Sequence, residues 1–227
     1  MKNSVKCVIV SALVFMVSFG ALAKNLPDLR TKSEAAAAVL REIVQTPDRG
    51  IPESLLSQAT CIATIPNVIR AGFIFGARFG RGLVSCRVLG QWSNPSYVTL
   101  AGGSWGLQIG AESIDLILVF VRPNAAEKFT RNNITLGADA SVAAGPVGRD
   151  AQAGTDYQLN SEIYSYSRSR GLFAGLTLEG SSLSVDRDAN ALAYGPTIDA
   201  RDLLYRSTMT SPKAVTPYLQ ALRMYVH

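Results

Sequence analysis

Histidine and cysteine, which often serve as catalytic bases and nucleophiles, are scarce in this chain. Its 227 residues include a single histidine, His227, at the last position. A Ser-His-Asp triad, a histidine general base or a histidine metal site therefore has no candidate earlier in the sequence. Cys61 and Cys86 also lack the histidine that commonly activates a thiol. These residues predict a binding protein and not an enzyme.

The best match to a metal motif is the segment 186–190. Asp186, Asp188 and Asn190 match the first, third and fifth places of a calcium loop. Ala191 then stands where the loop needs glycine, and Thr197 stands where a bidentate glutamate belongs. We therefore predict a turn held by side-chain hydrogen bonds, with no metal and no cofactor.

One pair of carboxylates, Glu112 and Asp115, has a spacing close enough to suggest acid-base work. Residues three apart on a strand point to opposite faces of the sheet. We therefore expect no acid-base function from this pair.

Arginines gather around one glycine-rich segment, at Arg70, Arg78, Arg81 and Arg87. A positive patch suits anionic lipid head groups, at about 1 kcal/mol for each contact. The glycines lack the spacing of a phosphate loop, but a turn expected at 81–82 would offer exposed amides to an anion. A solvated arginine face that only keeps the domain soluble is the alternative.

The elements that must position these arginines read as strands. Between residues 72 and 80, phenylalanines and Ala77 alternate with Ile74, Arg78 and glycines, and the segment 102–110 repeats this pattern. Glycine inside a strand marks a bend or a close approach by a neighbour. We expect a curved antiparallel sheet with another element packed tightly on its glycine face.

The rest of the chain predicts helices at both ends and more strands between them. A capping box at Thr31 opens an amphipathic helix that ends before Pro47, with Lys32 and Arg41 on its polar side. The expected fold class is α+β, a curved antiparallel β-sheet or barrel-like core with N-terminal and C-terminal helices packed on it. The other expected helices are 52–59, 123–129, 199–206 and 216–226, and the other expected strands are 61–65, 114–121, 136–144, 162–168 and 172–178.

Four long motifs carry a resemblance to a known family. They are GFIFGARFGRGLVSCR, WSNPSYVTLAGGSWGLQIGAESIDLILVF, LGADASVAAGPVGR and IYSYSRSRGLFAGLTLEG. Together they resemble the SYLF family, also called the lipid-binding or actin-binding-homology domain. The resemblance implies a domain that binds phosphoinositide membranes and, in some members, actin. It also links the amphipathic helix before the core to membrane attachment, although packing on the core is the more common role of such a helix.

The first residues read as a secretory leader. Lys2 and Lys6 precede an apolar run, and the run ends in the small-residue cleavage site at 21–23. The apolar run is short for a membrane anchor, which needs about 20 residues. We predict a signal peptide over 1–23, a single domain over 24–227, and a location in the periplasm or on the cell envelope.

Removal of the leader would change the formal charge, and export would place the remaining cysteines outside the cytosol. Loss of Lys2 and Lys6 lowers the formal charge from +5 to +3, too little to predict nucleic acid binding. An even pair of cysteines outside the cytosol predicts a Cys61–Cys86 disulfide, with two buried free thiols as the alternative.

The sequence therefore predicts a non-enzymatic envelope domain that binds anionic phospholipid or phosphoinositide-like head groups. The residues proposed for lipid binding are Arg78, Arg81, Lys32 and Arg41. An exported domain is not expected to meet actin. The alternative is a periplasmic protein that binds an envelope protein partner and no lipid, through sheet edges or the glycine face.

Overall fold

The structure is a computed structural model. It describes residues 25–46, 50–72, 75–105, 110–131, 133–146, 160–169, 172–176, 178–206 and 210–226. The predicted leader over 1–23 and the C-terminal His227 lie outside the described residues.

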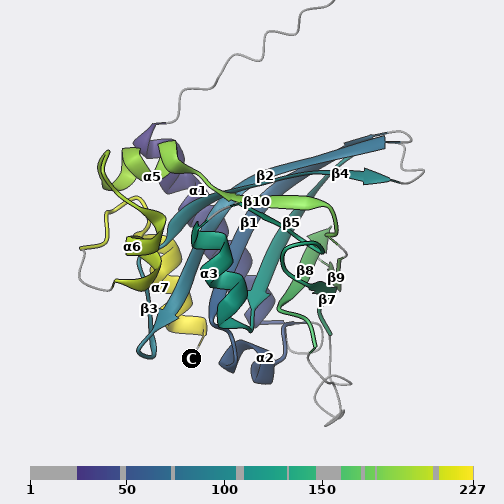
Figure 1. Cartoon of the computed structure of the whole chain (residues 1–227), viewed down its shortest axis with the longest axis horizontal. Coiled ribbons are helices and arrows are strands. Elements are labelled where there is room, and N and C mark those ends of the chain that lie inside the picture. The colour runs from purple at the N-terminus through teal and green to yellow at the C-terminus, as the bar shows by residue number, and fades with distance from the viewer. Residues whose placement is uncertain are drawn as a thin grey trace, which may run out of the picture.

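Ten strands of the described chain form one curled sheet, in the order β6-β10-β4-β2-β1-β5-β8-β7, with β3 beside β2 and β9 beside β8 (Figure 1). All pairs are antiparallel except β7 with β8. The strands are β1 (Cys61–Gly72), β2 (Phe75–Val88), β3 (Gln91–Trp92), β4 (Ser96–Trp105), β5 (Gly110–Phe120), β6 (Ile134–Thr135), β7 (Val142–Ala144), β8 (Ile163–Ser169), β9 (Leu172–Gly175) and β10 (Ser181–Val185).

Helices cover both faces of the sheet. They are α1 (Leu26–Val44), α2 (Glu53–Ser57), α3 (Pro123–Arg131), α5 (Arg187–Tyr194), α6 (Ala200–Tyr205) and α7 (Thr216–Tyr225). Figure 1 shows α3 in front of the sheet and α1 behind it. These elements confirm the predicted α+β class with a curved sheet and helices at both ends.

Two apolar cores lie on opposite faces of the sheet. The inner face carries Ala63, Leu116 and Leu183, which pack with Phe129 of α3. The outer face carries Ile62, Leu83 and Ile117, which pack with α1 and α7. Alternation along each strand therefore decides which core a residue joins.

A buried tyrosine ties the C-terminal helix to the outer face. The hydroxyl of Tyr218 lies 3.0 Å from Thr64 Oγ1 and donates to the carbonyl oxygen of Ile62 at 3.1 Å. The backbone amide of Tyr218 donates to Ser33 Oγ of α1 at 3.1 Å. This network joins α1, α7 and β1 inside an otherwise apolar core.

The first strand contains a β-bulge where the sequence predicted an end. We expected the strand to stop at Pro66, but β1 runs on to Gly72. Between Thr64 and Ile69 the strand advances five residues while β2 advances four, and it gains one residue on β5 as well. Asn67 takes a positive φ of 54°. Because a bulged residue leaves the ladder, proline is tolerated at this place.

The glycine face of β2 packs against this bulge. A Cβ on Gly82 would lie 2.1 Å from the carbonyl oxygen of Thr64 and 2.6 Å from Cα of Ile65, and one on Gly80 would lie 2.8 Å from Val68 Cγ2. The predicted close neighbour therefore exists, and it is the adjacent strand and not a helix. The turn predicted at 81–82 is wrong, because both residues lie inside β2. The chain turns at Leu89 and Gly90 instead, where both φ angles are positive.

Helix starts differ from the predictions in two places. Helix α1 begins at Leu26, with Asn25 Oδ1 accepting from the Asp28 amide at 2.8 Å, so the expected capping box at Thr31 lies inside the helix. Pro27 in the first turn suits this earlier start. At the other site, Asp186 Oδ1 accepts from the Ala189 amide at 3.1 Å and caps α5. The predicted side-chain-bonded turn is thus the first turn of a helix.

The Cys61–Cys86 disulfide predicted from the sequence is present. The two residues lie directly opposite each other on β1 and β2, both buried on the inner face. The bond joins the two strands at the end of the sheet away from the bulge.

Replacement of Gly82 by alanine should destabilise the fold by about 3 kcal/mol, because the new methyl group would meet backbone atoms that cannot move independently. Urea denaturation measures the loss. The matched control is Gly103→Ala, where the nearest atom would lie 3.8 Å away. Equal stability of the two variants would contradict the close packing.

Loss of the disulfide in a Cys61→Ser, Cys86→Ser variant should lower the free energy of unfolding by about 3 kcal/mol, since the bond closes a loop with a sequence separation of 25 residues. Urea denaturation with and without reductant tests this. Reductant should destabilise the wild type and leave the variant unchanged; a wild type insensitive to reductant would argue against the bond.

Candidate functional site

An apolar patch lies on the outer face at the far end of the β1–β2 hairpin. Ile69 and Phe79 lie directly opposite each other and are 56% and 47% exposed. We call the exposed residues around this pair the outer patch: Ile69, Ala71, Ala77, Phe79 and Ala101. In Figure 1 the far ends of β2 and β4 project beyond the helices. Large apolar side chains are thus exposed side by side.

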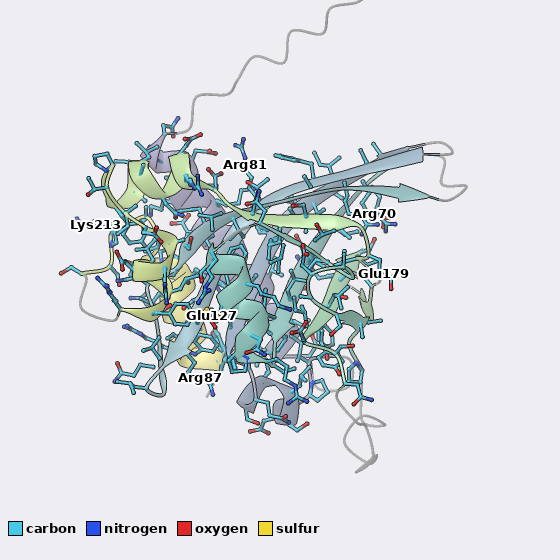
Figure 2. All side chains as sticks on the ribbon, viewed as in Figure 1. Arg70, Arg81, Arg87, Glu127, Glu179 and Lys213 are labelled. Carbon is cyan, nitrogen blue, oxygen red and sulfur yellow. A yellow bond between two sulfur atoms is a disulfide. The ribbon has the colours of Figure 1, made fainter. Side chains whose placement is uncertain are left out.

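One cation contacts the outer patch, and a second lies within electrostatic range of the first. The Arg81 guanidinium lies 5.7 Å from the centre of the Phe79 ring and 4.0 Å from the Asp186 carboxylate. Figure 2 shows Arg81 along the upper edge of the sheet. Burial lowers the pKa of Lys32 in α1, with Asp28 opposing the shift and Arg81 adding to it. Lys32 and Arg81 therefore lie close enough to interact.

A carboxylate on the same face as the outer patch holds the bulge in place. Asp115 Oδ1 accepts from the Asn67 amide at 3.0 Å, and Asp115 Oδ2 accepts from Arg168 Nε at 2.8 Å. Arg168 also forms an ion pair with Glu42 of α1. This chain of contacts joins β5, the bulge, β8 and α1.

A polar row crosses the inner face at the same end of the sheet. The register places five residues side by side on neighbouring strands: Glu112, Arg70, Arg78, Gly102 and Ser181. We call this set the inner row. Arg70 Nη1 lies 3.9 Å from Glu112 Oε2. Burial lowers the pKa of Arg78, and the neighbouring charge of Arg70 lowers it further.

The structure separates the four residues predicted to bind lipid. Arg81 and Lys32 lie together on the outer face, while Arg78 lies in the inner row and is 7% exposed. Arg41 lies nine residues beyond Lys32, about half a turn around α1. Its side chain lines a shallow groove of about 310 Å³ between α1 and α7.

Sequence reasoning counted Arg70 among the clustered arginines but did not assign it to the site. Arg70 joins the inner row because the bulge moves the later residues of β1 to the opposite face of the sheet. No local pattern in the sequence marks that change of face. As expected, Glu112 and Asp115 do point to opposite faces.

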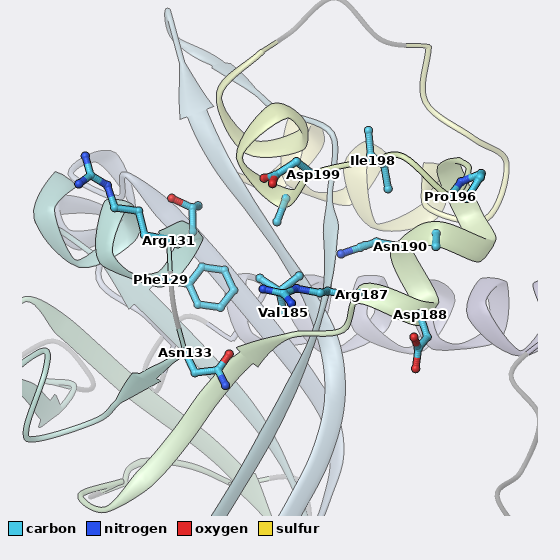
Figure 3. Close-up of a pocket in the computed structure, with 13 residues that line it drawn as sticks. Phe129, Arg131, Asn133, Val185, Arg187, Asp188, Asn190, Pro196, Ile198 and Asp199 are labelled. Carbon is cyan, nitrogen blue, oxygen red and sulfur yellow. The ribbon is translucent and has the colours of Figure 1, made fainter.

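The chain also has a polar pocket of about 350 Å³ between α3, α5 and the start of α6. Figure 3 shows Phe129 and Arg131 on one side and Asn190 and Asp188 on the other. Arg131 forms an ion pair with Glu127 of its own helix. Asp199 caps α6 through the Arg201 amide at 2.7 Å. These contacts give the Arg131 and Asp199 side chains roles in the local structure of α3 and α6.

The part of the chain that the structure describes shows neither a metal-ligand cluster nor a membrane-spanning helix. It holds no group of three histidine, cysteine or carboxylate residues that could bind a metal ion. None of the described helices has the length and hydropathy needed to cross a membrane.

Comparison with known proteins places the chain in a family. The family model described as "Ysc84: Las17-binding protein actin regulator" matches residues 101–225, more than half of the sequence. The chain belongs to the Ysc84 family. This confirms the resemblance to SYLF domains that the motifs indicated.

Eukaryotic members of the Ysc84 family are similar over most of this chain. Human SH3 domain-containing YSC84-like protein 1 is 36% identical over 198 residues, which cover 84% of this chain and 58% of the human protein. Protein YSC84 of Saccharomyces cerevisiae is 36% identical over 203 residues, 86% of this chain and 43% of its own length. The chain thus spans about half the length of these curated relatives.

The Ysc84 family description bears on the expected partners. It names a Las17-binding actin regulator, so it gives no support to the expectation that actin is excluded as a partner. The description names binding and regulation.

Proposed function

We propose that this Ysc84-family domain is a non-enzymatic module that binds the anionic surface of a membrane. The outer patch with the nearby cations Arg81 and Lys32 carries the proposal. An apolar surface beside positive charge matches the acyl boundary and the head groups of an anionic bilayer.

The energies of the two parts of this surface are comparable. Complete burial of a phenylalanine or isoleucine side chain stabilises by about 1.5–3 kcal/mol, and Ile69 and Phe79 are each about half exposed already. A basic residue near an anionic surface contributes about 1 kcal/mol. Neither part suffices alone, so binding should require both the apolar pair and anionic lipid.

We further propose that the membrane is that of a cell envelope, met from the periplasmic side. The support is the leader predicted over residues 1–23. Phospholipids with anionic or phosphoinositide-like head groups would be the ligands at such a surface.

A protein partner is the second candidate function. The family description names Las17, and the groove between α1 and α7 exposes Met224 beside Arg41 and Pro217. A partner seated there would cover the opposite side of α1 from the outer patch. It would predict crosslinks through α7 and no dependence on lipid.

Replacement of Ile69 and Phe79 by serine should weaken binding to anionic vesicles at least tenfold, because the bilayer no longer buries two apolar side chains. A tenfold loss corresponds to about 1.4 kcal/mol of binding free energy. Co-sedimentation measures the effect. The matched control is Leu89→Ser, which removes a 98% exposed side chain at the opposite end of β2. Unchanged binding by the double variant would overturn the assignment of this face.

Neutralisation of the two cations, in an Arg81→Gln, Lys32→Gln variant, should weaken vesicle binding about 30-fold, because each loss costs about 1 kcal/mol near an anionic surface. Binding to neutral phosphatidylcholine should not change. Arg223→Gln on α7 serves as the control with an exposed arginine elsewhere. A domain that sediments equally with neutral and anionic vesicles would contradict the charge requirement.

A further inference from the structure

The inner row is a second charged feature at the same end of the sheet, on the face opposite to the outer patch. Arg70 and Arg78 lie directly opposite each other on β1 and β2. Arg78 is 7% exposed and the Arg70 side chain 17% exposed. In Figure 2 Arg70 lies at the right-hand end of the sheet. Two arginine side chains thus leave neighbouring strands on the same face and lie largely away from water.

The two arginines bring like charges together across neighbouring strands. Like charges directly opposite each other across two strands repel, and burial strengthens the repulsion because the local dielectric constant is low. The bulge in β1 creates the pairing, since without the extra residue the side chain of Arg70 would point to the outer face. Two arginines that leave neighbouring strands on the same face are suited to an anion that bridges both groups.

The row also contains a buried hydroxyl. Ser181 is fully buried, and within the described part of the chain its Oγ has no hydrogen-bond partner. Ser181 lies on β10 and Arg78 on β2, and Gly102 on β4 lies between them. A Cβ on Gly102 would lie 2.8 Å from Ser181 Oγ. The missing side chain at Gly102 therefore gives the hydroxyl room over the inner face, between its own strand and Arg78.

Glu112, at the other end of the inner row, is a partner of Arg70 that an anion could displace. Its carboxylate lies 3.9 Å from Arg70 Nη1, is about half exposed, and also accepts from Ser169 Oγ at 2.6 Å. A surface ion pair of this length contributes little to stability. An incoming anion would compete with this carboxylate for Arg70.

We propose that Arg70 and Arg78 together bind one phosphate group on the inner face, with Ser181 Oγ as a neutral donor. Guanidinium groups match phosphate oxygens in pairs of parallel hydrogen bonds, and a tetrahedral phosphate can accept from both arginines at once. The identification of the phosphate as part of a lipid head group rests on the function proposed above. The anion site itself is argued from the inner row alone.

Calorimetric titration of the full domain with inorganic phosphate, against chloride at the same ionic strength, tests the site. The wild type should bind phosphate, and Arg70→Gln and Arg78→Gln should each weaken binding at least tenfold. Ser181→Ala should weaken it several-fold, and Arg223→Gln, at an exposed residue of α7, should leave it unchanged. Glu112→Gln should tighten binding several-fold, because it removes the competing carboxylate.

The Glu112 variant keeps the test decisive even where an arginine variant fails to fold, since this residue is exposed. A wild type that prefers phosphate no more than chloride would overturn the site. Unchanged or weaker phosphate binding by Glu112→Gln would also overturn it.

The source of the phosphate is tested with vesicles of phosphatidylcholine alone and with added phosphatidic acid. Parallel loss of phosphate and vesicle binding in Arg70→Gln would support a lipid head group as the ligand. Phosphate binding without vesicle binding would support a site for a soluble phosphate and contradict the proposed function. Vesicle binding without phosphate binding would contradict the anion site alone.

Discussion

The single extra residue in β1 is the constraint on which the rest of the structure depends. At Pro66 and Asn67 the strand leaves the ladder, and it returns one residue out of step with both β2 and β5. Because side chains alternate along a strand, the insertion turns every later residue to the other face. Ile69 consequently points outward beside Phe79, and Arg70 points inward beside Arg78.

The bulge also explains the glycines of β2. Backbone atoms of Thr64 and Ile65 approach Gly82 too closely for any side chain, and Val68 fills the space beside Gly80. The bulge is held from the outer face by Asp115, which accepts from the Asn67 amide and pairs with Arg168. Packing on one face and an ion pair on the other thus hold the irregular segment, and the helices leave the end beyond it uncovered.

Much of the fold could be predicted from local pattern. Period-two alternation located the long strands, an apolar run identified β5 as a central strand, and the even cysteine pair indicated the disulfide. The errors in the strands have a common physical cause, which is that contacts between strands override local signals. Pro66 normally ends a strand, but the amide of Asn67 bonds to Asp115, 48 residues away. The turn expected at 81–82 is wrong because Gly82 allows close packing of β2 on β1 and does not reverse the chain.

The site could be predicted only in part for the same reason. Arginine clustering pointed to the region of the outer patch and named Arg78 and Arg81, of which Arg81 lies beside the exposed Phe79. It could not assign faces: Arg78 and Arg81 lie on opposite sides of β2, and Arg41 lies away from Lys32 on α1. Face assignment needs the register across three strands, which the bulge in β1 alters.

The central claim is that the uncovered end of the hairpin, with Phe79 on its outer face, is the part that meets a membrane. Tryptophan emission from Phe79→Trp, compared with Leu89→Trp at the other end of β2 and with the parent spectrum subtracted from each, tests it most directly. Addition of anionic vesicles should shift the emission of the Phe79→Trp variant to shorter wavelength and leave that of the Leu89→Trp variant unchanged. A shift at position 89 alone, or at neither position, would contradict the account.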